Sequence, residues 1–112
     1  MNKFEIFTLG SNTGSQQFGD SFASMYDVLR YIAENHAEHV LTTGDKDVEY
    51  AVKKNGNIFV LLDTYSRGDL YMVYGCAMGV SYIIDFHGSI TNKASYTWLY
   101  NKTAWNYEPH YS

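Results

Sequence analysis

The stretch that decides the fold runs from residue 57 to 86 and reads Asn57-Ile-Phe-Val-Leu-Leu-Asp-Thr-Tyr65, Ser66-Arg-Gly-Asp69 and Leu70-Tyr-Met-Val-Tyr-Gly-Cys-Ala-Met-Gly-Val-Ser-Tyr-Ile-Ile-Asp-Phe86. Its apolar runs are rich in β-branched and aromatic residues, which is typical of strands on a half-buried pleated surface. The polar tetrapeptide at residues 66–69 predicts a turn between the first two runs. The glycines of segment 75–79 predict a β-bulge or a close approach of another backbone before the third run. We therefore expect this stretch to form the centre of an antiparallel sheet.

The dipeptide Asn55-Gly56 lies immediately before this stretch and predicts a tight hairpin, because both residues tolerate a positive φ. This turn favours a strand over a short helix for residues 48–54. The cross-strand pairs that a two-residue turn would create are Lys54 with Asn57, Val52 with Phe59, and Tyr50 with Leu61. In the strand that follows the turn, simple alternation places Ile58, Val60 and Leu62 on one face.

The segment of residues 21–37 is predicted to form the principal helix, because its apolar residues recur at helical spacing. Ser24, with Asp27 three residues later, is one candidate N-cap, and the polar residues at positions 20 and 21 are others. Arg30 and Glu34 are expected to form an ion pair on its surface. We expect the helix to lie across one face of the sheet, and residues 40–43 to form a short strand after it.

Residues 3–9 alternate in polarity and predict a first strand, whereas the polar, glycine-containing segment Gly10–Asp20 is expected to be a loop. With 112 residues, the chain fits a single domain that covers residues 1–112. We predict an α+β fold in which one principal helix packs on an antiparallel sheet of about five or six strands, in a meander-like order.

Composition limits the possible partners and surroundings of the protein. The net charge is −4 and no basic patch is visible, which disfavours nucleic-acid binding. Cys76 is the single cysteine, so no internal disulfide can form, and this weakly favours a reducing compartment. No signal core and no run of roughly 20 apolar residues is present, so we expect a cytoplasmic protein that does not associate with membranes.

Two segments have features of ligand sites. The glycine-containing segment Gly10–Asp20 lacks both the Lys-Ser/Thr pair and the glycine spacing of phosphate-binding loops, so a flexible surface loop is the favoured interpretation. His36 and His39 could share a helix face, but a third metal ligand would have to come from far away. The preference of helix C-termini for histidine explains the pair more simply. We therefore predict no metal site and no cofactor.

A catalytic interpretation rests on alternation in the segment Asp85, His87 and Ser89, with Cys76 as a conceivable nucleophile for the His87 base. Same-face neighbours in a strand lie roughly 6.5–7 Å apart, which is awkward for two successive short hydrogen bonds. A lone cysteine among Tyr, Ala and Met is more often a small buried apolar residue. We predict no catalytic residues.

The C-terminal segment carries the most suggestive residues. Tyr96, Trp98 and Tyr100 alternate along a predicted strand at residues 94–100, and Trp105 and Tyr107 follow. Tyr, Phe and Trp make up 17% of the chain, more than so small a domain can bury completely. Because Tyr and Trp dominate the hot spots of protein interfaces, we predict that these five residues bind a partner protein. The alternative is that the rings of this strand pack against the sheet.

These observations favour a small intracellular protein that binds another protein and inhibits it by occlusion, in the style of a toxin-immunity or phage counter-defence protein. One alternative is a small enzyme or nucleotide-binding domain that uses segment Gly10–Asp20 with Asp85 and His87. A second alternative is a structural protein that assembles with itself through sheet edges or aromatic faces.

Overall fold

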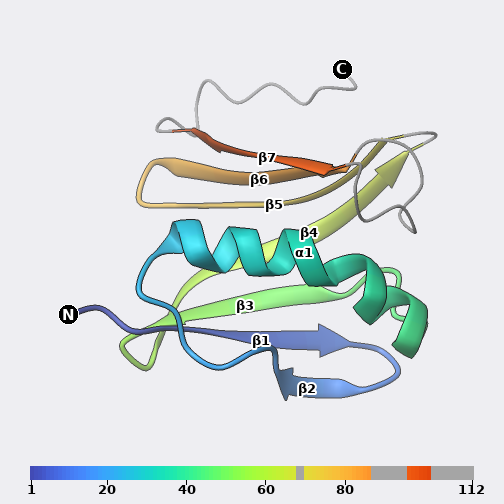
Figure 1. Cartoon of the computed structure of the whole chain (residues 1–112), viewed down its shortest axis with the longest axis horizontal. Helices are drawn as coiled ribbons and strands as arrows, with labels where there is room; N and C mark the ends of the chain where they lie inside the picture. The colour runs from blue at the N-terminus through green and yellow to red at the C-terminus, as the bar shows by residue number, and fades with distance from the viewer. Residues whose placement is uncertain (68–69, 87–95, 102–112) are drawn as a thin grey trace.

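The computed structural model describes residues 1–67, 70–86 and 96–101, and only the backbone of residues 66–67, 70–71 and 96–101. The protein is an α+β domain in which one helix packs on an antiparallel sheet (Figure 1). The strand order β2-β1-β3-β4-β5-β6 is mostly that of a meander, as predicted, and β7 lies beside β6. The elements are β1 (Phe4–Gly10), β2 (Gly14–Gln17), α1 (Met25–Thr43), β3 (Glu49–Lys54), β4 (Asn57–Arg67), β5 (Leu70–Ala77), β6 (Val80–Phe86) and β7 (Tyr96–Asn101).

Strand β4 joins the two halves of the sheet. Its residues up to Leu62 pair with β3, and its residues from Asp63 onward pair with β5. Figure 1 shows β4 running diagonally from the half that contains β1, β2 and β3 to the half that contains β5, β6 and β7. Since β4 is 11 residues long, one strand can serve both halves. The central position predicted for this stretch is confirmed.

The turn between β3 and β4 is the predicted one, but the register beyond it differs. Asn55 and Gly56 have φ values of 53° and 86°, and Lys54 pairs with Asn57. Beyond a β-bulge at Val52/Lys53, the observed partners are Val60 for Val52 and Leu62 for Tyr50, one residue further along β4 than predicted. A bulge sets two residues of one strand against one of the other and so reverses the faces beyond it.

The bulge also corrects the prediction that Ile58 shares a face with Val60 and Leu62. Ile58 is 58% exposed, whereas Phe59 packs against the core. The ring of Phe59 lies edge-on to the ring of Phe4, with centroids 6.0 Å apart. Burial of this aromatic ring on the side of the helix gives a physical reason for the extra residue in β4.

Helix α1 begins and ends later than predicted. Ser24 is its N-cap and accepts a hydrogen bond from the backbone N–H of Asp27, and Gly44 ends it with φ 77° and an N–H bond to the carbonyl of Val40. Residues 40–43 are therefore the last turn of the helix, and the short strand predicted there is wrong. The physical reason is that the buried stripe of α1 continues beyond residue 37, because His36 is fully buried and Val40 lies one turn further on.

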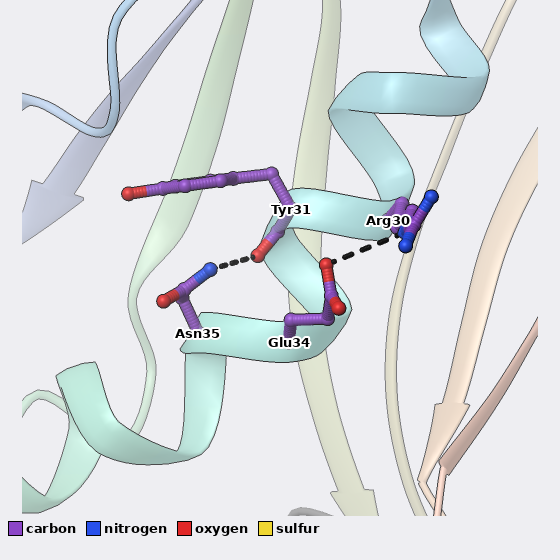
Figure 2. Close-up of polar contacts among 4 residues, drawn as sticks. All are labelled: Arg30, Tyr31, Glu34 and Asn35. Atoms are coloured by element: carbon purple, nitrogen blue, oxygen red, sulfur yellow. Dashed lines mark hydrogen bonds and ion pairs between the residues drawn. The ribbon is translucent and has the colours of Figure 1, made fainter.

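The core lies between α1 and one face of the sheet. Its largest fully buried apolar side chains come from both layers and include Ile6, Leu29, Ile32, Tyr50, Leu62 and Ile84. Figure 2 shows two polar contacts between residues of α1. The predicted Arg30–Glu34 pair forms at 3.5 Å, and the Asn35 amide donates to the carbonyl of Tyr31 at 2.8 Å. Within the described residues, no helix combines the length and the apolar character needed to cross a bilayer.

The glycine-bracketed segment 75–79 contains a close approach of another backbone, which confirms one of the two alternatives predicted for it. It also contains a tight turn. A Cβ atom added at Gly75 would lie 2.2 Å from the carbonyl oxygen of Leu61 in β4. Met78 and Gly79, with φ values of 54° and 77°, form the turn that pairs Ala77 with Val80. Gly75 is thus required by the packing of β5 on β4.

Replacing Gly75 tests this approach. Gly75→Ala should lower the free energy of unfolding by about 2 kcal/mol or more, because the clash is with backbone and cannot be relieved by turning a side chain. Cys76→Ala, an exposed position next to it, should change that free energy by less than about 0.5 kcal/mol. Urea unfolding curves of the three proteins measure both values. Equal stability of Gly75→Ala and the wild type would contradict the β4–β5 packing.

Candidate functional site

The segment Gly10–Asp20 is not a free loop, which corrects the prediction. Residues Gly14–Gln17 form the edge strand β2, antiparallel to β1. The turn before β2 donates hydrogen bonds to the carboxylate of Asp45, a residue that follows the C-terminal end of α1. Its donors are the backbone N–H of Asn12 at 2.7 Å, the hydroxyl of Thr13 at 2.9 Å and the hydroxyl of Ser11 at 3.2 Å.

The carboxylate of Asp45 takes the place that an anionic ligand would need. Asp45 is buried, with a relative exposure of 2%. Burial raises the pKa of its carboxyl, but the hydrogen bonds from Asn12, Thr13 and Ser11 outweigh this, so the pKa lies below its usual value. The Asn12 amide also donates to the carbonyl of Thr43 at 2.9 Å. The turn therefore serves to attach the β1–β2 hairpin to the end of α1.

His36 is a structural residue of the core. Its Nδ1 is hydrogen-bonded to the hydroxyl of Tyr50 in β3 at 2.5 Å, and its ring lies 5.2 Å from the ring of Phe86. Burial, together with the neighbouring charge of His39, lowers the pKa of His36 to about 3. His36 is thus neutral at physiological pH and joins the helix to both halves of the sheet.

His39 lies one turn away and does not join His36 in a ligand set. Its ring packs edge-on against Phe18, with centroids 5.3 Å apart, and its Nε2 is buried without a hydrogen-bond partner among the described residues. Burial lowers the pKa of His39, and the charge of Asp45 opposes this shift. In the described part of the chain, no group of three or more His, Cys, Asp and Glu side chains is placed to hold a metal ion.

The residues of the catalytic alternative are only partly described. Asp85 is buried in β6, opposite Met72 of β5. His87 and Ser89 lie outside the described residues. Cys76 is exposed, which corrects the expectation of a buried apolar residue. It is exposed because it lies on the part of β5 that continues beyond the last β4–β5 pair, Asp63 with Tyr74.

The face of the sheet opposite α1, which we call the helix-free face, carries a row of apolar side chains. Phe7 of β1 pairs with Ala51 of β3, and Ala51 pairs with Leu61 of β4, so the three side chains lie in line across three strands. Leu61 is 48% exposed, and Ile58 on the same strand is 58% exposed. We call Phe7, Ala51 and Leu61 the apolar row.

The apolar row leads into a hollow of about 310 Å³ beside the point where β4 and β5 cease to pair. Its apolar lining comes from Leu61, Tyr74, Gly75 and Ile83. Its polar lining comes from Asp63, Cys76 and Ser81. Register explains the arrangement, since Asp63 pairs with Tyr74, Tyr74 with Ile83, and Cys76 with Ser81. The hollow is thus built by the three adjacent strands β4, β5 and β6.

The predicted partner-binding residues fall in two places. Tyr96, Trp98 and Tyr100 lie on β7, whose register with β6 pairs them with Phe86, Ile84 and Tyr82. The strand predicted for them is present, but their side chains are not described. Trp105 and Tyr107 lie outside the described residues. The partner-binding role of all five stays a prediction.

Sequence reasoning missed the hollow. The only signal was the glycine-bracketed segment 75–79, which indicated a close backbone approach but not which residues would surround it. Leu61 and Asp63 are two residues apart in β4 and line the same hollow. Their proximity to Cys76 and Ser81 depends on the pairing of β4, β5 and β6.

Comparison with protein-family models, curated proteins and solved structures finds no match for this chain.

The buried state of His36 predicts that acid destabilises the fold. A histidine whose pKa is about 3 when folded and 6.5 when unfolded adds stability above pH 6.5, and this is lost as the pH falls toward 3. From pH 7.5 to 5.5 the loss from His36 should be about 1.4 kcal/mol. Urea unfolding at the two pH values measures it. His36→Gln should remove most of the difference, and an unchanged difference would show that His36 is not its source.

The attachment of the β1–β2 turn predicts a local effect of Asp45. Asp45→Ala removes the acceptor of the Asn12 N–H, so hydrogen exchange at this amide should accelerate about tenfold or more. Amides in the centre of α1 should exchange at the wild-type rate, because their bonds lie within the helix. Asp47→Ala, at an exposed position two residues away, is the matched control. Equal protection of Asn12 in all three proteins would contradict the contact.

Proposed function

We propose that this protein binds another protein through the helix-free face of its sheet and inhibits that partner by covering its working surface. A toxin-immunity protein or a phage counter-defence protein acts in this style. The observation that carries the proposal is the apolar row and the hollow into which it leads. The solvated face of an antiparallel sheet is normally polar, so apolar side chains that continue across its strands mark an interaction surface.

The contacts around the apolar row support this interpretation. Leu61 and Ile58 leave about half of their side chains exposed, although each lies on the strand at the centre of the sheet. The ammonium group of Lys53 lies 4.8 Å from the centre of the Phe7 ring, which places a charge at the margin of the row. An apolar centre bordered by charge is the usual anatomy of a protein interface.

The predicted aromatic strand lies on the same half of the sheet as the hollow. Ile83 lines the hollow, and its partner in β7 is Leu99, between Trp98 and Tyr100. Leu99 is therefore the β7 position beside the hollow, whereas Tyr96, Trp98 and Tyr100 pair with residues of β6 that belong to the core under α1. Of the five predicted residues, we propose Trp105 and Tyr107 as the aromatic contacts of this interface.

The described residues favour binding over catalysis. The donors of the glycine-containing turn are engaged by Asp45, and Asp85 is buried within β6. A nucleotide phosphate at that turn would have to displace a carboxylate that three donors hold in place.

Capture of a partner tests the proposal. Tagged wild-type protein should retain one partner in stoichiometric amount from a native lysate, and the purified partner should lose its activity when the protein is added. Leu61→Asn should weaken binding about tenfold or more while leaving the melting temperature nearly unchanged, because Leu61 is half exposed. The double variant Trp105→Ala/Tyr107→Ala should weaken binding to a similar extent.

Leu41→Asn is the matched control. Leu41 is 60% exposed on α1, on the opposite side of the sheet, so its substitution should leave capture unchanged. Capture that Leu61→Asn leaves intact, or that Leu41→Asn abolishes, would contradict the proposed face. Concentration-dependent sedimentation of the isolated protein would favour self-assembly instead.

A further inference from the structure

The hollow on the helix-free face is large enough to hold one extended side chain. Its volume of about 310 Å³ lies at the lower limit of ligand sites, which range from roughly 300 to 1,000 Å³. Leu61 and Ile83 supply apolar walls, and Gly75 leaves its position without a side chain. A site of this size and lining accepts one extended group with an apolar stem.

The charge of the hollow is negative. Asp63 is the only residue with a formal charge among the described residues that line it. Its side chain is exposed, and it makes no hydrogen bond or ion pair with any described residue. The carboxylate is therefore available to a ligand, and it lies on an acidic protein whose net charge is −4. A cationic head group complements this site.

Tyr74 narrows the choice of cation. It lies directly opposite Asp63 in the β4–β5 register and lines the same hollow, so a carboxylate and an aromatic ring lie side by side. A guanidinium group bonds to a carboxylate through two parallel N–H groups, stacks on aromatic rings, and is less strongly hydrated than an ammonium group. Its three-carbon stem suits apolar walls such as Leu61 and Ile83.

We infer that the hollow receives an arginine side chain of the partner protein. The stem of the arginine lies between Leu61 and Ile83, and its guanidinium bonds to Asp63 beside Tyr74. This inference rests on the proposed function, and it states the chemistry by which the partner is recognised at this point of the interface.

Cys76 provides a direct reporter, because it is exposed, lines the hollow and is the only cysteine of the chain. The probe is N-acetyl-arginine amide at about 20 mM, since a single side chain binds weakly. Its control is N-acetyl-citrulline amide, which has nearly the same shape and no charge. The rate at which the neutral reagent iodoacetamide modifies Cys76, followed by mass spectrometry, should fall about twofold or more with the arginine derivative only.

Asp63→Asn is the matched variant, because it keeps the shape of the side chain and removes its charge. In this variant the arginine and citrulline derivatives should have the same effect on Cys76. Equal protection by both derivatives in the wild type, or no protection by either, would overturn the inference. Faster modification of Trp105→Ala/Tyr107→Ala without any probe would also overturn it, since the hollow would then be covered by the C-terminal residues of the chain itself.

The capture experiment separates failure of this inference from failure of the proposed function. Asp63→Asn should reduce partner capture about tenfold, as Leu61→Asn does. Loss of capture in Leu61→Asn but not in Asp63→Asn would overturn the arginine inference and leave the proposed protein-binding face in place. Capture that is indifferent to both substitutions would overturn the proposed face as well.

Discussion

The sharing of β4 between two half-sheets is the constraint on which the rest of this structure depends. The strand pairs with β3 as far as Leu62 and with β5 from Asp63 onward, so its partner changes within a single peptide step. At this change Gly75 allows β5 to approach the carbonyl of Leu61. The resulting sheet is wide enough for a 19-residue helix to cover one face, and the hollow lies on the other face beside the same junction.

Polar groups in the interior hold the helix to this sheet at two points. The His36–Tyr50 hydrogen bond fixes the middle of α1 to β3, and the Asp45 carboxylate fixes the β1–β2 turn to the end of α1. Both contacts satisfy groups that would be costly to bury alone. Histidines and a glycine-rich turn, which resemble ligand sites in the sequence, therefore contribute to stability here.

The two faces of the sheet differ in what they can do. The face under α1 is closed by aliphatic and aromatic packing. The helix-free face presents the apolar row and a hollow with one carboxylate among its described lining residues. Apolar side chains on a solvated face do not by themselves destabilise a fold, but they favour association with a complementary apolar surface. The proposed protein-binding function relies on this asymmetry, and the proposed recognition of an arginine lies at the β4–β5 junction.

The sequence by itself determined the features that local interactions decide. These are the strands of residues 57–86, the Asn55-Gly56 turn, the Ser24 cap and the α+β class, because β propensity, positive φ and capping act between neighbouring residues. Only the tertiary structure decided the last turn of α1, the bulge that packs Phe59 against the core, the strand within Gly10–Asp20 and the hollow. Each depends on a contact between distant segments, such as His36 with Tyr50, Phe59 with Phe4, or Gly75 with Leu61. The periodicity of apolar residues along the chain does not predict contacts between distant segments.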